Sequence, residues 1–152
     1  DPYGIEFWPE FKGRDGCRTP MPWVTDNANA GFSTGRPWLP MVAPHLVRSV
    51  AAEEGDPQSM LAHYRRTLAF RRAHATLVTV AMEMLAPEGE VARFIRRGDE
   101  VIFCAFNLSG EEARLSLPEG KWTALGAELG SAAPTGVSVT LAPWGVCLAK
   151  QG

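Results

Sequence analysis

From residue 78 to the end of the chain, apolar and polar residues alternate in short runs separated by Gly, Pro and charged residues. A period of two residues is typical of strands that are buried on one face. The run at 101–107 differs, because it is almost continuously apolar. These runs predict about seven strands, at residues 78–85, 91–97, 101–107, 113–117, 121–125, 137–141 and 145–149. Short strands at this spacing indicate a mainly β fold, an antiparallel β-sandwich of Greek-key type.

Before the strands, the apolar residues follow a helical period. Asp56 is suited to an N-cap and Pro57 to the first helical position. The apolar residues fall on one stripe and the arginines on the other side, and Arg71 and Arg72 also suit the negative end of the helix dipole. One amphipathic helix is therefore predicted over about 57–74. The stripe consists of Met60, Leu61, Tyr64, Leu68 and Ala75, with Phe70 and Leu77 beside it.

Residues 1–50 follow neither period. They hold seven of the twelve prolines, together with Trp8, Trp23 and Trp38. A stretch of this length without regular structure is unusual in a compact domain and is typically functional. Exposed aromatic residues are a liability unless they cover something. We therefore expect a long loop that rests on another surface.

Composition narrows the class of protein. The 152 residues are 45% hydrophobic and 21% charged, as in a soluble globular domain, and the formal net charge is -2. This balance argues against nucleic acid as a partner, because phosphate binding needs concentrated positive charge. No apolar run is long enough to span a bilayer, so no membrane partner is expected. The chain does not open with a signal peptide or with Met, which suggests a processed chain or a piece of a longer one.

The cysteines Cys17, Cys104 and Cys147 are odd in number and far apart in the sequence. Cys104 and Cys147 lie in apolar strands and are interpreted as small core residues. This usage favours reduced thiols and a cytoplasmic location.

The residues alone give little support for catalysis by this chain. The adjacent acids Glu53-Glu54 and Glu111-Glu112 diverge in space and form no acid and base pair. Metal and phosphate motifs are absent, and the histidines are not spaced as a triad, so neither a metal nor a cofactor is expected. The glycosylation sequon at 107–109 is interpreted as a chance match.

The stretch 13–23 is the strongest candidate for a binding site. Arg14, Asp15 and Arg18 lie near tryptophans, between glycines and prolines. Guanidinium and carboxylate groups bond to vicinal hydroxyls, and aromatic rings cover the C–H face of a sugar, so these residues suit a sugar site. The alternative is a structural loop, in which the arginines pair with Asp15 and other nearby carboxylates while Trp23 packs inward.

Two strings of the sequence strongly resemble the α-glucosidase branch of glycoside hydrolase family 13, the α-amylase family. They are RDGCRTPMPW at residues 14–23 and NAGFSTGRPWLP at residues 29–40. The predicted helix and the strands after it are similar to the C-terminal end of that family, so the resemblance covers nearly the whole chain.

The resemblance implies a TIM barrel followed by a C-terminal sandwich, with the nucleophilic Asp, the acid/base Glu and a stabilising Asp on barrel strands upstream of these strings. Residues 1–76 would then be the end of the barrel, with a sugar-site loop at 1–50 and the last barrel helix at about 57–74. Residues 77–152 would be the sandwich. Retaining hydrolysis needs two carboxyl groups across the glycosidic bond, so this chain is predicted to be inactive alone. Its implied partners are the missing barrel and, through the intact enzyme, an α-glucoside.

The resemblance also implies roles for three residues. Arg14 would reach the sugar in the −1 subsite, beside an Asp from an early barrel loop that this chain lacks. Arg18 would order the loop, and Asp15 would hold it by accepting hydrogen bonds. Pro22 stands where many members have Gln or Val, which leaves the motif intact.

Two other interpretations remain open. A free-standing carbohydrate-binding module would need a row of exposed aromatic residues on the sandwich, where the only tryptophans are Trp122 and Trp144. A purely structural module would cap a barrel or mediate an interface without any affinity for sugar.

Overall fold

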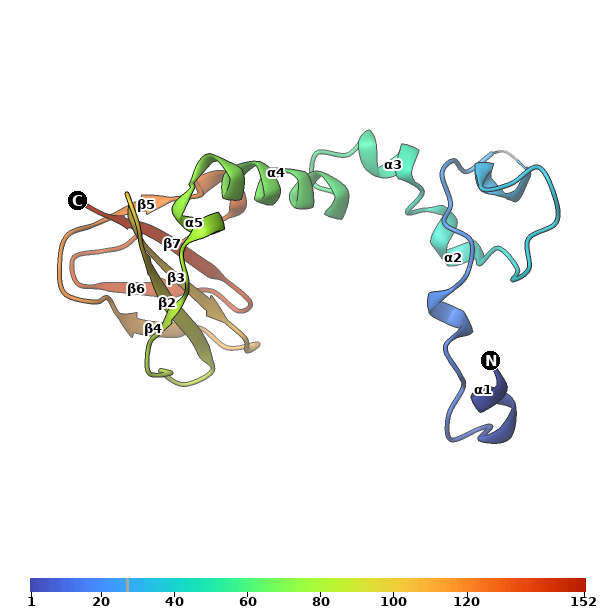
Figure 1. Ribbon diagram of the computed structural model, residues 1–152, viewed down its shortest axis with the longest axis horizontal. Coiled ribbons are helices and arrows are strands. Elements are labelled where there is room, and N and C mark those ends of the chain that lie inside the picture. Colours follow the sequence, from blue (N-terminus) through green and yellow to red (C-terminus); the bar gives the residue numbers. More distant parts are fainter. Residues whose placement is uncertain (27) are drawn as a thin grey trace. The chain divides into compact units, whose positions relative to one another are not determined.

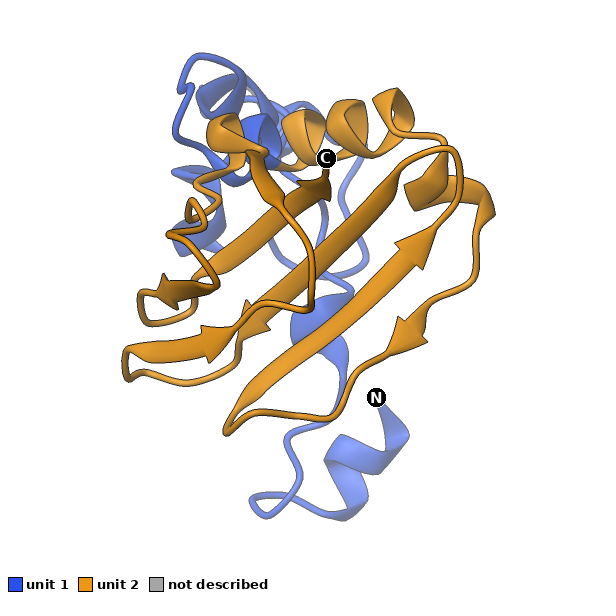
Figure 2. Ribbon diagram, turned by 90° about the vertical axis from the view of Figure 1, so that its left-hand side faces the viewer, with its two compact units in different colours: residues 1–63 blue, residues 64–152 orange. Residues whose placement is uncertain are grey.

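The computed structural model describes residues 1–26 and 28–152 (Figure 1). The chain divides into two compact units, residues 1–63 and residues 64–152 (Figure 2). The boundary falls inside helix α4 (Met60–Ala73), so this helix contributes to both units. The family-based domain division after residue 76 stays a prediction.

In the described residues, seven strands form two antiparallel sheets, both in the unit 64–152. One sheet has the order β1-β2-β3-β7-β5, and the other pairs β4 with β6. From β4 onward each strand lies in the opposite sheet from the one before it, so the chain crosses between layers at every connection. The predicted mainly β, antiparallel sandwich is confirmed. The strands are β1 (Glu83–Met84), β2 (Val91–Arg97), β3 (Val101–Asn107), β4 (Ala113–Ser116), β5 (Trp122–Leu125), β6 (Ser138–Leu141) and β7 (Val146–Gln151).

The core of this unit lies on both faces of the five-stranded sheet. Phe103, Ala105 and Cys147 belong to one buried cluster, with Leu115 of β4 and Leu141 of β6. A second cluster contains Ile102, Cys104, Leu148 and Leu77, with Phe70 of α4 packed against it. Because β3 contributes to both clusters, its sequence is apolar without alternation.

The two strand cysteines are buried and unpaired, as expected for core residues. Burial raises the pKa of Cys104 to about 12 and that of Cys147 to about 11, since a thiolate is poorly solvated there. Both therefore remain neutral thiols near pH 7.

The strand predicted at 78–85 is wrong in its first half. The structure has a short helix α5 (Thr76–Thr79), and only Glu83 and Met84 pair with β2. The physical reason is tertiary: Leu77 is buried in the second cluster, and Arg96 donates from Nη1 to the carbonyls of Leu77 and Val80 at 3.1 and 2.6 Å. Satisfied carbonyls at a helix end favour a helical turn over a strand.

The predicted helix is present but begins later, at Met60. The Asp56 carboxylate accepts the N–H of Gln58 at 2.8 Å within the preceding turn. Ser59 provides the cap instead, because its hydroxyl accepts the N–H of Ala62 at 3.1 Å. On the apolar stripe, Met60 and Tyr64 are mostly exposed in this structure.

Short helical turns and irregular backbone make up residues 1–26 and 28–59, in agreement with the absence of any period there. The turns are α1 (Pro2–Glu6), η1 (Asp15–Cys17), η2 (Ala28–Gly31), α2 (Ala43–Leu46) and α3 (Val50–Glu54). Within the described residues, no helix is both long and apolar enough to cross a membrane.

Backbone hydrogen bonds hold the middle of this unit at Trp23. Its N–H donates to the carbonyl of Ala30 at 2.8 Å, and its carbonyl accepts the N–H of Ala51 in α3 at 3.0 Å. Asn29 and Ala30 adopt left-handed backbone, with φ of 51° and 50°, which non-glycine residues rarely adopt. The Asn29 side chain compensates by donating to the carbonyls of Ser33 and Gly35.

Candidate sugar-contact cluster

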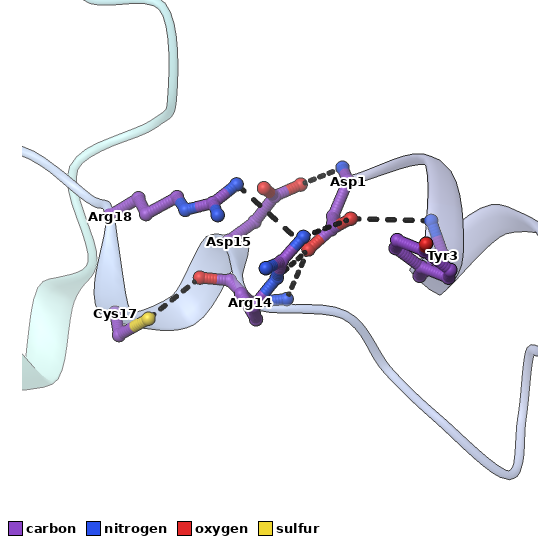
Figure 3. Close-up of polar contacts among 6 residues, drawn as sticks. All are labelled: Asp1, Tyr3, Arg14, Asp15, Cys17 and Arg18. Carbon is purple, nitrogen blue, oxygen red and sulfur yellow. Dashed lines mark hydrogen bonds and ion pairs between the residues drawn. The ribbon is translucent and has the colours of Figure 1, made fainter.

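Helix η1 places the two motif arginines at its two ends. Arg14 precedes η1 and Arg18 follows it, and the N–H of Arg18 donates to the carbonyl of Asp15 at 3.0 Å. This short turn brings both guanidinium groups toward the same carboxylate (Figure 3). That carboxylate belongs to Asp1, not to Asp15.

Asp1 is the centre of the cluster. Its Oδ2 accepts Arg14 Nε at 2.7 Å and the Arg14 backbone N–H at 3.1 Å, and its Oδ1 accepts Arg14 Nη2 at 3.3 Å. Arg18 Nη1 lies 3.9 Å from Oδ2. The Asp1 side chain is only 1% exposed, whereas those of Arg14 and Arg18 are 52% and 50% exposed. A buried carboxylate therefore fixes the Arg14 guanidinium and attracts that of Arg18, and both cations remain open to solvent.

Asp15 makes a different contact. Its Oδ2 accepts a hydrogen bond from the backbone nitrogen of Asp1 at 2.8 Å. This contact ties the start of α1 to η1, and the loop-holding role of Asp15 stays a prediction.

Sequence reasoning missed Asp1, because it lies thirteen residues before Arg14. A close approach of two glycines brings these segments together: a Cβ on Gly4 would lie 2.9 Å from the Cα of Gly13. Gly13 itself has a φ of 79°, which favours glycine. Gly4 and Gly13, nine residues apart, were the signal that the sequence offered for this approach. Two glycines do not indicate which carboxylate the approach brings near the arginines.

The aromatic surroundings differ from the predicted pocket. Tyr3 lies beside Arg14, with the guanidinium carbon 5.8 Å from the ring centroid, and Lys12 lies over Trp8 at 6.0 Å. Trp8, Trp23 and Trp38 are all exposed, with Trp38 97% exposed. The expectation that Trp23 packs inward is therefore wrong. The other part of the structural alternative, arginines paired with a nearby carboxylate, is present with Asp1 as the carboxylate.

This cluster is suited to hold an oxygen-rich neutral ligand. A guanidinium has more N–H donors than the contacts with Asp1 use, and its plane is fixed by the paired contact. Among the described residues, no group of three or more His, Cys, Asp or Glu side chains is arranged to hold a metal ion.

The sandwich tryptophans have contrasting surroundings. Trp122 is partly buried against Phe103, and its Nε1 donates to the carbonyl of Pro118 at 2.8 Å. Trp144 is 71% exposed and has a φ of 58°. One open indole is not the row of exposed rings that a sugar-binding sandwich face would present.

A model of the alpha-amylase catalytic domain matches residues 3–80, slightly more than half of the sequence. The chain belongs to the alpha-amylase family. A "Probable alpha-glucosidase" of Rhizobium meliloti (strain 1021) is 52% identical over 119 residues, which cover 78% of this chain and 21% of that protein. A "Glucan 1,6-alpha-glucosidase" of Streptococcus pneumoniae is 35% identical over 133 residues, which cover 87% of this chain and 24% of that protein.

Solved structures agree with this assignment. The alpha-glucosyl transfer enzyme XgtA matches 100% of this chain and 29% of its own, with a TM-score of 0.90 and 40% identity. A trehalulose synthase, MutB, matches 91% of this chain with a TM-score of 0.74 and 31% identity. The chain thus belongs to the α-glucosidase branch of the family and spans less than a third of the length of these relatives.

Proposed function

We propose that this chain is the C-terminal segment of an enzyme that hydrolyses α-glucosides with retention, and that Arg14 contacts the sugar in the −1 subsite. The observation that carries the proposal is the half-exposed Arg14 guanidinium, held in one orientation by the buried Asp1 carboxylate. The relatives named alpha-glucosidase and glucan 1,6-alpha-glucosidase support the substrate class.

Arg14 would act by binding and orientation. Its remaining N–H groups would donate to sugar hydroxyls, and the pairing with Asp1 would reduce the side-chain entropy lost on binding. Arg18 and Asp15 would act by positioning Arg14. Arg18 lies near the Asp1 carboxylate that binds Arg14, and Asp15 accepts a hydrogen bond from the backbone nitrogen of Asp1. The nucleophile and the general acid would come from the rest of the enzyme, so the isolated chain would not hydrolyse glucosides.

The experiment uses a chimera in which this chain replaces the matching segment of the Rhizobium meliloti relative. We expect the chimera to cleave maltose or isomaltose and the isolated chain to cleave neither. Arg14→Ala should lower kcat/KM by about 10- to 100-fold, the size expected for one lost charge-assisted hydrogen bond. Arg48→Ala is the matched control, an exposed arginine in the same unit, and should stay near the parent value.

Each part of this experiment has a result that would contradict the proposal. Hydrolysis by the isolated chain would disprove the dependence on missing carboxylates. An Arg14→Ala chimera as active as Arg48→Ala would remove Arg14 from the sugar site. Saturable binding of maltose to the isolated chain, measured by calorimetry, would instead favour a sugar-binding module.

The cellular location is also a proposal. We infer a cytoplasmic protein from the buried, unpaired Cys104 and Cys147, which fit a reducing compartment. Fractionation of the source cells, with an antibody against this chain, would test it, and recovery outside the cytoplasm would contradict it.

A further inference from the structure

Strand β4 leaves one edge of the two-stranded sheet open. Within residues 1–26 and 28–152, β4 pairs with β6 alone, and the ladder continues with the N–H of Leu117 donating to the carbonyl of Val137 at 2.9 Å. Hydrogen-bonding groups alternate in direction along an antiparallel strand. The backbone groups of Arg114 and Ser116 therefore point away from β6. Figure 1 shows β4 and β6 together in one layer of the strand-containing unit.

Two side chains, Glu88 of the turn between β1 and β2 and Arg93 of β2, occupy the open groups of Ser116. The N–H of Ser116 donates to Glu88 Oε1 at 3.4 Å, and Arg93 Nη1 donates to the carbonyl of Ser116 at 3.2 Å. Glu88 and Arg93 also pair with each other at 2.6 Å. The pair thus offers one acceptor and one donor to a single residue, as a neighbouring strand would.

The position of Arg93 makes this arrangement specific. Val91 and Ile95, two positions to either side of it on β2, are buried in the sandwich core, so Arg93 points inward on the same face. Its side chain is only 16% exposed, and Nε donates to the carbonyl of Ala86 at 2.7 Å. An inward-pointing charge at the border of a sheet is a known means of preventing edge-to-edge pairing.

The surface around the pair is otherwise open to an approaching chain. Hollows of about 310 and 360 Å³ are both lined in part by Glu88 and Ser116, and Arg114 lines the larger one. Ser116 is exposed, and the ion pair occupies its outward-pointing hydrogen-bonding groups.

We propose that the β4 edge is a self-association surface that the Glu88–Arg93 pair keeps closed. The partner it would accept is a second copy of this chain, because an antiparallel pairing of β4 with itself is self-complementary. A two-fold axis at Leu115 would place Arg114 of one copy opposite Ser116 of the other, and both residues carry the outward-pointing groups.

The test measures, by light scattering over a concentration series, the molar mass of the chimera described above, in which the exposed aromatic residues of 1–50 have the rest of an enzyme to cover. We expect the parent chimera to keep one molar mass over the series, and Glu88→Ala combined with Arg93→Ala to double that mass as concentration rises. Glu88→Gln, which keeps the acceptor Oε1, should keep the parent mass. The matched control is Glu83→Ala combined with Arg97→Ala, which removes a 2.9 Å ion pair that has no recorded bond to β4.

A rescue variant shows whether β4 itself makes the contact. Ser116→Pro removes the outward N–H without touching the β6 ladder, and proline is tolerated on edge strands. Added to the double variant, it should restore the parent mass. If circular dichroism shows that the double variant does not fold, the molar mass of the single variant Glu88→Ala tests the proposal instead. A folded Glu88→Ala or double variant with the parent mass, or a dimer that survives Ser116→Pro, would overturn the proposal.

Discussion

Asn107 shows how a single buried polar residue holds a connection in place. The residue is 2% exposed, and its Nδ2 donates to the carbonyls of Glu111 and Ala142 at 2.7 and 2.9 Å. Its Oδ1 accepts both the N–H and the hydroxyl of Ser109. The amide therefore joins the end of β3 to the turn before β4 and to the turn after β6. An amide engaged in this way is not open to glycosylation in the folded protein, which fits the interpretation of the sequon as a chance match.

We expect Asn107→Asp to lower the free energy of unfolding by about 2–3 kcal/mol, because a carboxylate would face two buried carbonyls with no donor. Ser109→Ala removes a hydroxyl that donates to the same amide and accepts the N–H of Glu111 at 3.3 Å, and it leaves no buried charge, so the loss should be about 1 kcal/mol. Urea unfolding of the chain, followed by circular dichroism, measures both. Equal stability of Asn107→Asp and the parent would show that these hydrogen bonds contribute little.

Helix α5 and the β2–β3 turn depend on a close approach at Gly98. The hydroxyl of Thr76 donates to the carbonyl of Glu100 at 3.2 Å and accepts its N–H at 3.3 Å. A Cβ on Gly98 would lie 2.7 Å from that hydroxyl and 2.9 Å from a methyl carbon of Val80. Because Thr76 is held on both sides, it cannot move aside without losing these bonds.

Gly98→Ala should therefore destabilise the chain by about 1–3 kcal/mol, the usual size for overpacking. Gly110→Ala is the matched control, since nothing lies within 4 Å of its Cβ position, and it should change stability by less than about 0.5 kcal/mol. Thermal unfolding of both variants tests the difference. A Gly98→Ala protein that melts with the Gly110→Ala protein would contradict the close packing of α5.

The stability of the whole strand-containing unit should depend on pH through Glu100. Its carboxylate contacts His74 Nδ1 at 2.7 Å, just after α4, and Lys150 Nζ of β7 at 2.9 Å. The hydrogen bond with His74 is the main reason that the pKa of Glu100 lies below its ordinary value of 4.5, and the bond with Lys150 adds to it. One carboxylate thus ties the end of the helix to the five-stranded sheet.

A carboxyl whose pKa falls on folding stabilises the native state above its unfolded pKa, and this contribution disappears as pH falls through the folded pKa. The parent should therefore exceed Glu100→Gln in Tm at pH 6, and the gap should close toward pH 3. Calorimetry at several pH values measures it. A gap that stays constant over this range would show that the ionised carboxylate of Glu100 is not what stabilises the unit.

Across these scales, local pattern was enough to predict the strands from β2 onward and the existence of helix α4. Alternation along β4 and β6 reflects one buried face, and the unbroken apolar run of β3 reflects two. These features depend on which face of a strand is buried, and the spacing of apolar residues along the sequence indicates that face directly. The motif with Arg14 and Arg18 was likewise sufficient to place the chain in its family.

Tertiary structure decided what local pattern leaves open. Residues 76–79 became helical because Leu77 is buried and Arg96, on another element, binds the carbonyls. Asp1 became the partner of both arginines through a glycine contact distant in the sequence. The partner of a charge and the fate of a short apolar run depend on what other segments bring near. The sequence by itself therefore determined which faces are buried, and only the folded chain decided which side chains meet.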